Sequence, residues 1–129
     1  IFKERKKIAG VYLNRLKKRI KLQADPTVIF AIKNENKKYD TIIKRVLLSD
    51  LKINSKFNTY KIRGLPPGPI CMPDLTSIEA VLNADKHDYI FFVADPDKPG
   101  YHNFSKSLKM HNFYKRKYIN WINRLKILR

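Results

Sequence analysis

The segment Tyr89-Ile90-Phe91-Phe92-Val93-Ala94 decides the fold class, because it is the clearest strand in the 129-residue sequence. It is apolar throughout, and a short apolar run of this kind is typical of a strand that is buried and central in its sheet. Turn-forming residues from Asp95 to Gly100 follow it. We therefore expect Tyr101 to Phe104 to return as the second strand of a hairpin.

Two longer helices are predicted on either side of this hairpin. From Glu4 to about Arg19, apolar residues recur at helical spacing while basic residues take the other face, which predicts an amphipathic helix. After the hairpin, Ser105 or Ser107 is expected to begin a long C-terminal helix.

Two shorter helices are predicted between them. Asp25 and Pro26 have the order of an N-cap and a first helical residue, so we expect a helix that continues from Thr27 to Ile32. The capping-box pattern Thr76-Ser77-Ile78-Glu79 predicts another helix, which ends at about Leu82.

The remaining segments are less clearly patterned. Residues 34–38 read as a polar turn, Ile42 to Leu48 is compatible with strand or helix, and Tyr60 to Ile62 reads as a short strand. Together these patterns predict an α+β fold. We expect residues 1–129 to form a single compact domain, in which a small sheet is packed by helices.

The charge of the chain is strongly positive, at +17, with 28 Lys and Arg against 11 Asp and Glu. Such an excess fits nucleic acid, anionic lipid or another polyanion as a partner. It is concentrated at the ends, since no acidic residue occurs from Lys98 to Arg129 and Glu4 is the only one among the first 24 residues. A compositional drift of the whole surface toward Lys, Asn and Ile is the favoured explanation of the charge; a selected polyanion site and attraction toward a membrane or wall surface stay open as alternatives.

Metal and cofactor motifs are missing from the sequence. The three histidines have no metal-ligand spacing, and the single cysteine, Cys71, lies in an apolar loop where we expect it to be buried. No Gly-x-Ser-x-Gly elbow or phosphate-binding loop is present. From the missing ligand spacing and the missing loop motifs we expect no metal and no cofactor. No apolar run reaches the roughly 18 residues of a membrane span.

The loop Gly64-Leu65-Pro66-Pro67-Gly68-Pro69-Ile70, called here the Gly/Pro loop, has a backbone fixed by its composition. Each proline locks φ and lacks an N–H, while glycine permits angles that other residues avoid. Such a loop is either plain scaffold or the wall of a binding groove, and the residues alone favour neither. Nearby side chains that could hydrogen-bond or stack on a sugar-like ligand, each with a structural alternative, are Gln23, Asn58, Tyr60, His102 and Ser105.

Several short motifs follow one another along the chain in an order that can be compared with known families. They are Val11-Tyr12-Leu13-Asn14-Arg15-Leu16, then Leu22-Gln23-Ala24-Asp25-Pro26-Thr27-Val28, then Asn58-Thr59-Tyr60 with the Gly/Pro loop, and finally His102-Asn103-Phe104-Ser105. In this order they resemble the endolytic murein transglycosylase family of YceG-like, or MltG-type, proteins. The resemblance covers nearly the whole chain, from about Glu4 to Asn112.

The resemblance implies a bacterial lytic transglycosylase, a lyase of cell-wall biogenesis. Such an enzyme is held in the inner membrane by a single span, with its catalytic domain facing the periplasm or wall. It cuts nascent peptidoglycan strands between N-acetylmuramic acid and N-acetylglucosamine and leaves 1,6-anhydromuramoyl ends. Peptidoglycan strands are then the expected partner, with wall-synthesis enzymes as further ones. One acid suffices, because the muramoyl C6 hydroxyl attacks in place of water, unlike in two-carboxylate hydrolysis.

The family carries that acid on a glutamate in a Glu-Lys-Glu-like motif upstream of the Asn-Arg-Leu helix. This sequence opens at Ile1, after the place where the motif should stand, and Glu4 matches a later acidic position. We therefore expect a fragment that is truncated at its N-terminal side and inactive by itself, with the membrane anchor outside it. Arg19 stands where the family often closes the first helix with glycine.

By position, the resemblance makes Gln23, Asp25, Asn58, Tyr60 and His102 groove residues. Ser105 joins them as a polar neighbour, and the loop scaffold consists of Gly64, Leu65, Pro66, Pro67 and Pro69. The alternative from another class is a basic nucleic-acid-binding module without catalysis, which the charge and the aromatic residues among lysines favour.

Overall fold

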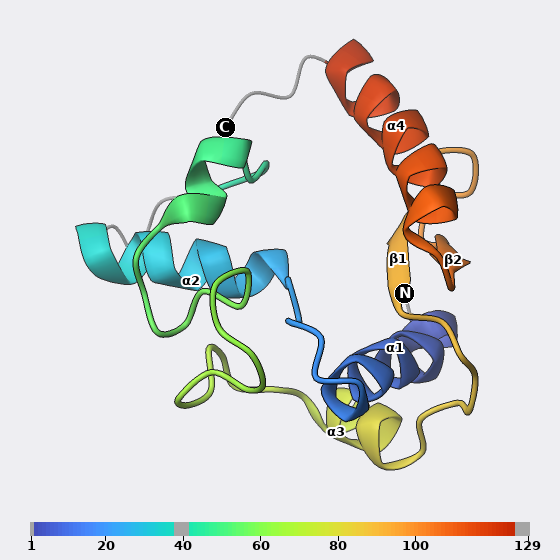
Figure 1. Ribbon diagram of the computed structural model, residues 1–129, viewed down its shortest axis with the longest axis horizontal. Coiled ribbons are helices and arrows are strands. Elements are labelled where there is room, and N and C mark those ends of the chain that lie inside the picture. The colour runs from blue at the N-terminus through green and yellow to red at the C-terminus, as the bar shows by residue number, and fades with distance from the viewer. Residues whose placement is uncertain (1, 38–41, 126–129) are drawn as a thin grey trace. The chain divides into compact units, whose positions relative to one another are not determined.

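The computed structural model describes residues 2–37 and 42–125, drawn as a coloured ribbon in Figure 1. The chain divides into two compact units, and each is described by itself. The first unit contains residues 2–17 and 73–125, and the second contains residues 18–37 and 42–72. Helices and a small antiparallel sheet occur together, so the predicted α+β class is confirmed. The single compact domain stays a prediction.

The sheet of the first unit is the predicted hairpin. Strand β1 (Phe91–Ala94) pairs antiparallel with β2 (His102–Ser105), and Phe91 lies opposite Ser105. In the turn between them, the amide of Asp95 donates to the carbonyl of Tyr101 at 2.9 Å. Among the described residues the sheet has two strands, so the prediction that β1 is central was wrong. All of β1 is half-buried, because helices rather than further strands cover it.

Helix α1 (Arg5–Lys17) follows a short 3-10 helix, η1 (Phe2–Glu4), and confirms the predicted N-terminal helix. Its buried side includes Val11 and the polar Arg15. The segment before β1 docks on this helix: Nδ2 of Asn14 donates to the carbonyl oxygens of His87 and Tyr89, at 2.7 and 2.9 Å. This close approach of a backbone segment explains why a glycine, Gly10, is buried in the middle of α1.

Helix α3 (Leu75–Leu82) packs on α1, but its cap differs from the predicted one. Asp74 is the N-cap, and its carboxylate accepts the amide of Ser77 at 2.8 Å. The hydroxyl of Thr76 donates to the same carboxylate, and Arg5 forms an ion pair with it at 3.0 Å. These donors hold the pKa of Asp74 well below its usual range, with the hydrogen bonds from Ser77 contributing most.

Helix α4 (Leu108–Arg124) is the predicted C-terminal helix, and Ser107 is its N-cap. The Ser107 hydroxyl accepts the amide of Met110 at 3.2 Å, which satisfies one of the open donors of the first turn. The inner side of α4 covers the sheet, where the His111 ring stacks on Phe91 with centroids 4.7 Å apart.

The second unit contains α2 (Asp25–Asn36) and a 3-10 helix, η2 (Leu48–Lys52). Ala24, not Asp25, is the N-cap of α2, and it makes no side-chain capping bond; Asp25 is the first helical residue. The helix runs through most of the predicted polar turn at 34–38 and ends with Lys37 in the left-handed region, at φ 51°. Its buried side chains form the core of this unit: Thr27, Val28, Ala31 and Ile32.

Two segments of the second unit differ from the sequence-based expectation. Residues 42–47 have no regular structure, and the chain then enters η2, so the expected strand or helix from Ile42 to Leu48 was wrong. Tyr60 to Ile62 form turns instead of a strand, because the amides of Lys61 and Ile62 both donate to the carbonyl of Asn58, at 3.0 and 3.1 Å.

We expect Gly10→Ala to destabilise the chain, although alanine is normally better than glycine inside a helix by about 0.5–1 kcal/mol. The new Cβ would lie 2.5 Å from the carbonyl oxygen of Asp85 and 2.6 Å from Nε2 of His87. Overpacking of this kind costs on the order of 1–3 kcal/mol, measurable by urea denaturation. Gly68→Ala is the matched control, because nothing lies within 4 Å of its Cβ. A Gly10→Ala chain as stable as the parent would contradict this packing.

Candidate functional site

The predicted site residues occur in both units. Gln23, Asp25, Asn58, Tyr60 and the Gly/Pro loop lie in the second unit, and His102 and Ser105 lie in the first. The predicted site residues therefore fall into two groups, one in each unit.

The side chain of Asn58 holds the turn that carries the Asn-Thr-Tyr motif. It is fully buried, at 0% exposure. Its Nδ2 donates to the carbonyl oxygens of Leu51 and Ile53, both at 2.9 Å, and its Oδ1 accepts the amide of Tyr60 at 3.0 Å. The polar atoms of Asn58 are thus occupied by backbone groups, and the residue shapes the site without presenting a surface.

Thr59, which the sequence did not single out, joins two motifs that are far apart in the chain. Its hydroxyl lies 2.8 Å from that of Thr27 and accepts the amide of Ala24 at 2.9 Å. Its carbonyl accepts the amide of Gln23 at 3.1 Å. Because Thr27 and Thr59 are both buried, these bonds fix the start of α2 against the Asn-Thr-Tyr turn. The only sequence signal was that both threonines belong to the motif blocks.

Three polar side chains border this buried support. The Tyr60 hydroxyl donates to Oδ1 of Asp25 at 2.5 Å. Gln23 and Asp25 are exposed and Tyr60 is half-buried. The backbone of Gln23 adopts the left-handed region at φ 48°, which is uncommon for a residue other than glycine. The hydrogen bond from its amide to the carbonyl of Thr59 stabilises this conformation. We call Gln23, Asp25 and Tyr60 the polar rim.

The Gly/Pro loop follows the polar rim along the chain. Gly64 has φ +79°, a value that favours glycine, so its place in the motif has a backbone reason. Along the loop, Leu65, Pro67 and Pro69 are exposed, and Gly64 and Pro66 are half-buried. Exposed apolar rings and side chains of this kind are suited to stacking on a sugar face.

In the first unit, His102 is paired with Glu4. Oε1 of Glu4 accepts the backbone amide of His102 at 2.6 Å and lies 3.0 Å from Nδ1 of its ring. Both side chains are largely covered, with 14% of Glu4 and 19% of His102 exposed. Glu4 belongs to η1, just before α1, and its carboxylate holds this segment against the start of β2.

Ser105 lies at the inner end of β2, beside Phe91, and is buried. Its hydroxyl and Nδ1 of His111 have no hydrogen-bond partner among the described residues. Arg15 is buried nearby, where its Nη1 donates to the carbonyl of Ile90 at 2.5 Å and its guanidinium lies over the Phe91 ring. Burial lowers the pKa of His111, and the cations Lys115 and Arg15 lower it further, which favours the neutral form of its ring.

Among residues 2–37 and 42–125, no group of three His, Cys, Asp or Glu residues could hold a metal ion. None of the described helices combines the length and apolar character that crossing a membrane requires. Cys71 is exposed, which corrects the expectation that it is buried.

Comparisons with known proteins cover both units. Residues 2–117 match the model of the YceG-like family. A Bacillus subtilis protein named endolytic murein transglycosylase is 49% identical over 117 residues, which is 91% of this chain and 30% of that protein. A Streptococcus pneumoniae protein of the same name is 39% identical over 93 residues, 71% of this chain and 16% of that protein.

A solved structure gives the same result. The crystal structure of a YceG-like protein from Listeria monocytogenes aligns with a TM-score of 0.69 at 40% identity. The alignment covers 82% of this chain and 31% of that one. The chain thus spans about a third or less of the length of these relatives.

We expect Asn58→Asp to destabilise the second unit strongly. The substitution keeps the size of the side chain but removes the two N–H donors to Leu51 and Ile53, and it places a carboxylate against their carbonyl oxygens. The loss should be about 2–4 kcal/mol in urea denaturation. Tyr60→Phe is the control, since the bond it removes is exposed and its loss should stay within about 1 kcal/mol. Equal effects would show that Asn58 does not carry the turn.

We also expect Glu4→Ala to free the backbone amide of His102, which then loses its acceptor. Hydrogen exchange of that amide should become faster by about 5- to 100-fold, corresponding to roughly 1–3 kcal/mol. Glu4→Gln keeps an oxygen at the same place and should preserve most of the protection. Unchanged exchange in Glu4→Ala would rule out this contact.

Proposed function

The chain belongs to the YceG-like family, and we propose that it is part of an endolytic murein transglycosylase that cuts peptidoglycan strands within their length. The observation that carries this proposal is the 49% identity to the Bacillus subtilis protein of that name, over 91% of the chain. The match extends over both units, and with them over both groups of candidate residues. No finding favours the nucleic-acid-binding alternative.

In this proposal the second unit holds the glycan. The polar rim offers an amide, a carboxylate and a phenol, which suit the hydroxyl and acetamido groups of amino sugars. Asn58 and Thr59 act by positioning: they bind backbone groups at the start of α2 and in the Asn-Thr-Tyr turn, so the rim residues keep a fixed geometry. The exposed residues of the Gly/Pro loop, among them Leu65 and Pro67, then form an apolar wall beside the rim.

In the first unit, Glu4 and His102 act by positioning as well. The carboxylate of Glu4 already accepts two contacts from His102 and has little exposed surface, so it is poorly placed to protonate a leaving oxygen. It fixes the segment that begins α1, and the expected general acid of the family precedes this segment in sequence. Ser105 is a buried residue of β2, opposite Phe91 in the sheet, and in this proposal it has a structural role.

The chemistry follows from the family resemblance. A general acid donates a proton to the glycosidic oxygen as that bond breaks. The muramoyl C6 hydroxyl forms the new bond to the anomeric carbon and releases its own proton, so the products are a 1,6-anhydromuramoyl end and a free N-acetylglucosamine hydroxyl. We place this reaction at the outer face of a bacterial inner membrane, where a membrane anchor and wall-synthesis enzymes belong to the same proposal.

A comparison of two proteins tests this proposal. The full-length parent protein should release fragments with anhydromuramoyl ends from peptidoglycan, detected by mass spectrometry of the muropeptides. The 129-residue chain should give none, because we expect the general acid upstream of Ile1. Products with reducing ends from the parent would overturn the transglycosylase assignment. Anhydro products from the 129-residue chain alone would instead overturn only the upstream acid.

A further inference from the structure

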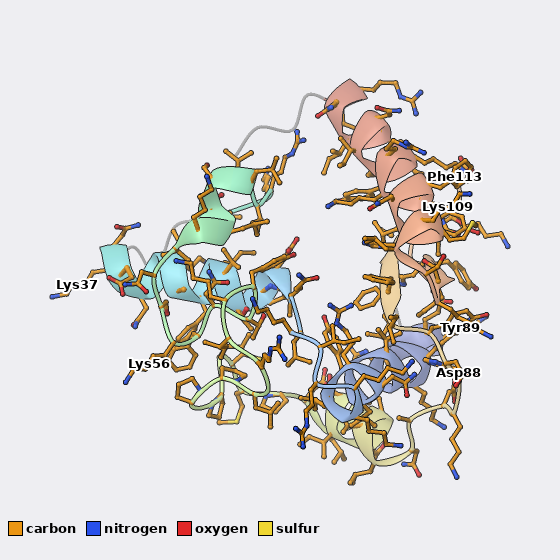
Figure 2. The ribbon with its side chains drawn as sticks, viewed as in Figure 1. Lys37, Lys56, Asp88, Tyr89, Lys109 and Phe113 are labelled. Carbon is orange, nitrogen blue, oxygen red and sulfur yellow. The ribbon has the colours of Figure 1, made fainter. Side chains whose placement is uncertain are left out.

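The outward side of α4 carries cations around exposed apolar side chains. Lys109, Met110, Phe113, Arg116 and Lys117 form this surface, which we call the basic–aromatic face, and all five are exposed. Relative to Phe113 they occupy positions three and four residues before and after it, which places them on one side of the helix. Figure 2 shows Lys109 and Phe113 next to each other on the same side of α4.

The packing of α4 does not need this face. The inner side covers the sheet through the stacking of His111 on Phe91, and Ile122 is buried. By contrast, Phe113 is 55% exposed and Met110 is 44% exposed. These two apolar side chains therefore lie on the outer side of a helix that is already anchored by its inner side, and the ring contact recorded for Phe113 is with its neighbour Tyr114.

The charge of the face is largely uncompensated. The sequence has no acidic residue from Lys98 onward. Across the part of the chain that the structure describes, the one carboxylate that pairs with this face is Asp97, whose hydrogen bond raises the pKa of Lys117. Among the described residues, Lys109 and Arg116 have no carboxylate partner. Lys106, which is also exposed, lies two residues before the start of α4 and adds to the positive charge. A strongly positive potential is therefore expected over Phe113.

We propose that the basic–aromatic face docks on the surface of an anionic phospholipid membrane. Lysine and arginine would bind the headgroups, while Phe113 and Met110 would enter the boundary between headgroups and acyl chains. A hydrophilic polyanion, such as nucleic acid or an anionic wall polymer, would attract the cations but would leave the aliphatic Met110 without an apolar environment. This membrane binding is separate from glycan cleavage and does not depend on it.

Sedimentation of the 129-residue chain with lipid vesicles tests the proposal. Vesicles of phosphatidylglycerol and phosphatidylcholine should bind it, and vesicles of phosphatidylcholine alone should not. Lys109→Gln combined with Arg116→Gln should weaken binding by roughly 25-fold, since each cation near such a surface contributes about fivefold. Phe113→Ser should weaken it by about fivefold through the lost apolar contact.

Matched controls lie in the second unit. Lys37→Gln with Lys56→Gln removes the same charge from exposed positions, labelled in Figure 2, and should change binding much less. Leu48→Ser removes an apolar side chain that is 78% exposed and should have no effect. Circular dichroism verifies the folding of each variant. If Phe113→Ser is unfolded, Phe113→Asn takes its place.

Three outcomes would overturn the proposal. The unmodified chain could fail to bind the anionic vesicles, or the control pair could lose as much affinity as the α4 pair, which would leave only attraction by the whole net charge. Alternatively, the α4 lysine and arginine could matter while Phe113→Ser binds as before. That result would identify the face as a site for a soluble anionic polymer. None of these outcomes bears on the muropeptide assay, so the two proposals fail independently.

Discussion

Backbone groups that the helices and the sheet leave unpaired need hydrogen-bond partners, and in this chain a few polar side chains provide them. Asn58 binds three backbone groups in the second unit, and Asn14 binds two carbonyls in the first. Glu4 accepts the amide of His102, and Asp50 accepts that of Leu47. The elements are short and the connecting segments long, so these side chains determine where each connection runs. Loss of one would leave a buried polar group unpaired, at a cost of about 1–3 kcal/mol.

The same constraint explains why the candidate site is built in two layers. Asn58 and Thr59 are buried and satisfied by backbone atoms, while the next residue, Tyr60, reaches the surface and meets Asp25. One tripeptide therefore supplies both the support and part of the polar rim. Because the support also joins the start of α2, the positions of Gln23 and Asp25 depend on bonds made by a motif about 35 residues away. In such a motif some residues only hold the backbone in place, as Asn58 and Thr59 do, and others reach the surface where a ligand could bind, as Tyr60 does.

What the sequence predicted well was local. The amphipathic α1 and α4, the Ser107 cap and the hairpin all follow from periodicity and turn chemistry within a few residues. What it missed was long-range. Thr59 pairs with Thr27, and Glu4 meets His102 from a position 98 residues earlier, so no local pattern could reveal either. Arg19 stands where the family often has glycine, and its backbone still adopts φ 56°, in the left-handed region that favours glycine.

Compositional drift and a selected anion-binding surface both contribute to the positive charge, at different places on the chain. Glu4, Asp25, Asp50 and Asp74 have structural roles, since each is bound to donors of the protein. With 28 Lys and Arg against 11 Asp and Glu, a net charge of +17 remains. A drift toward lysine accounts for exposed cations of the second unit such as Lys37 and Lys56. It does not account for Phe113 and Met110, because drift toward Lys, Asn and Ile would not place phenylalanine and methionine on an outer helix face. On the outer face of α4, exposed apolar side chains and cations lie on the same side of one helix, a combination suited to a boundary between charge and hydrocarbon.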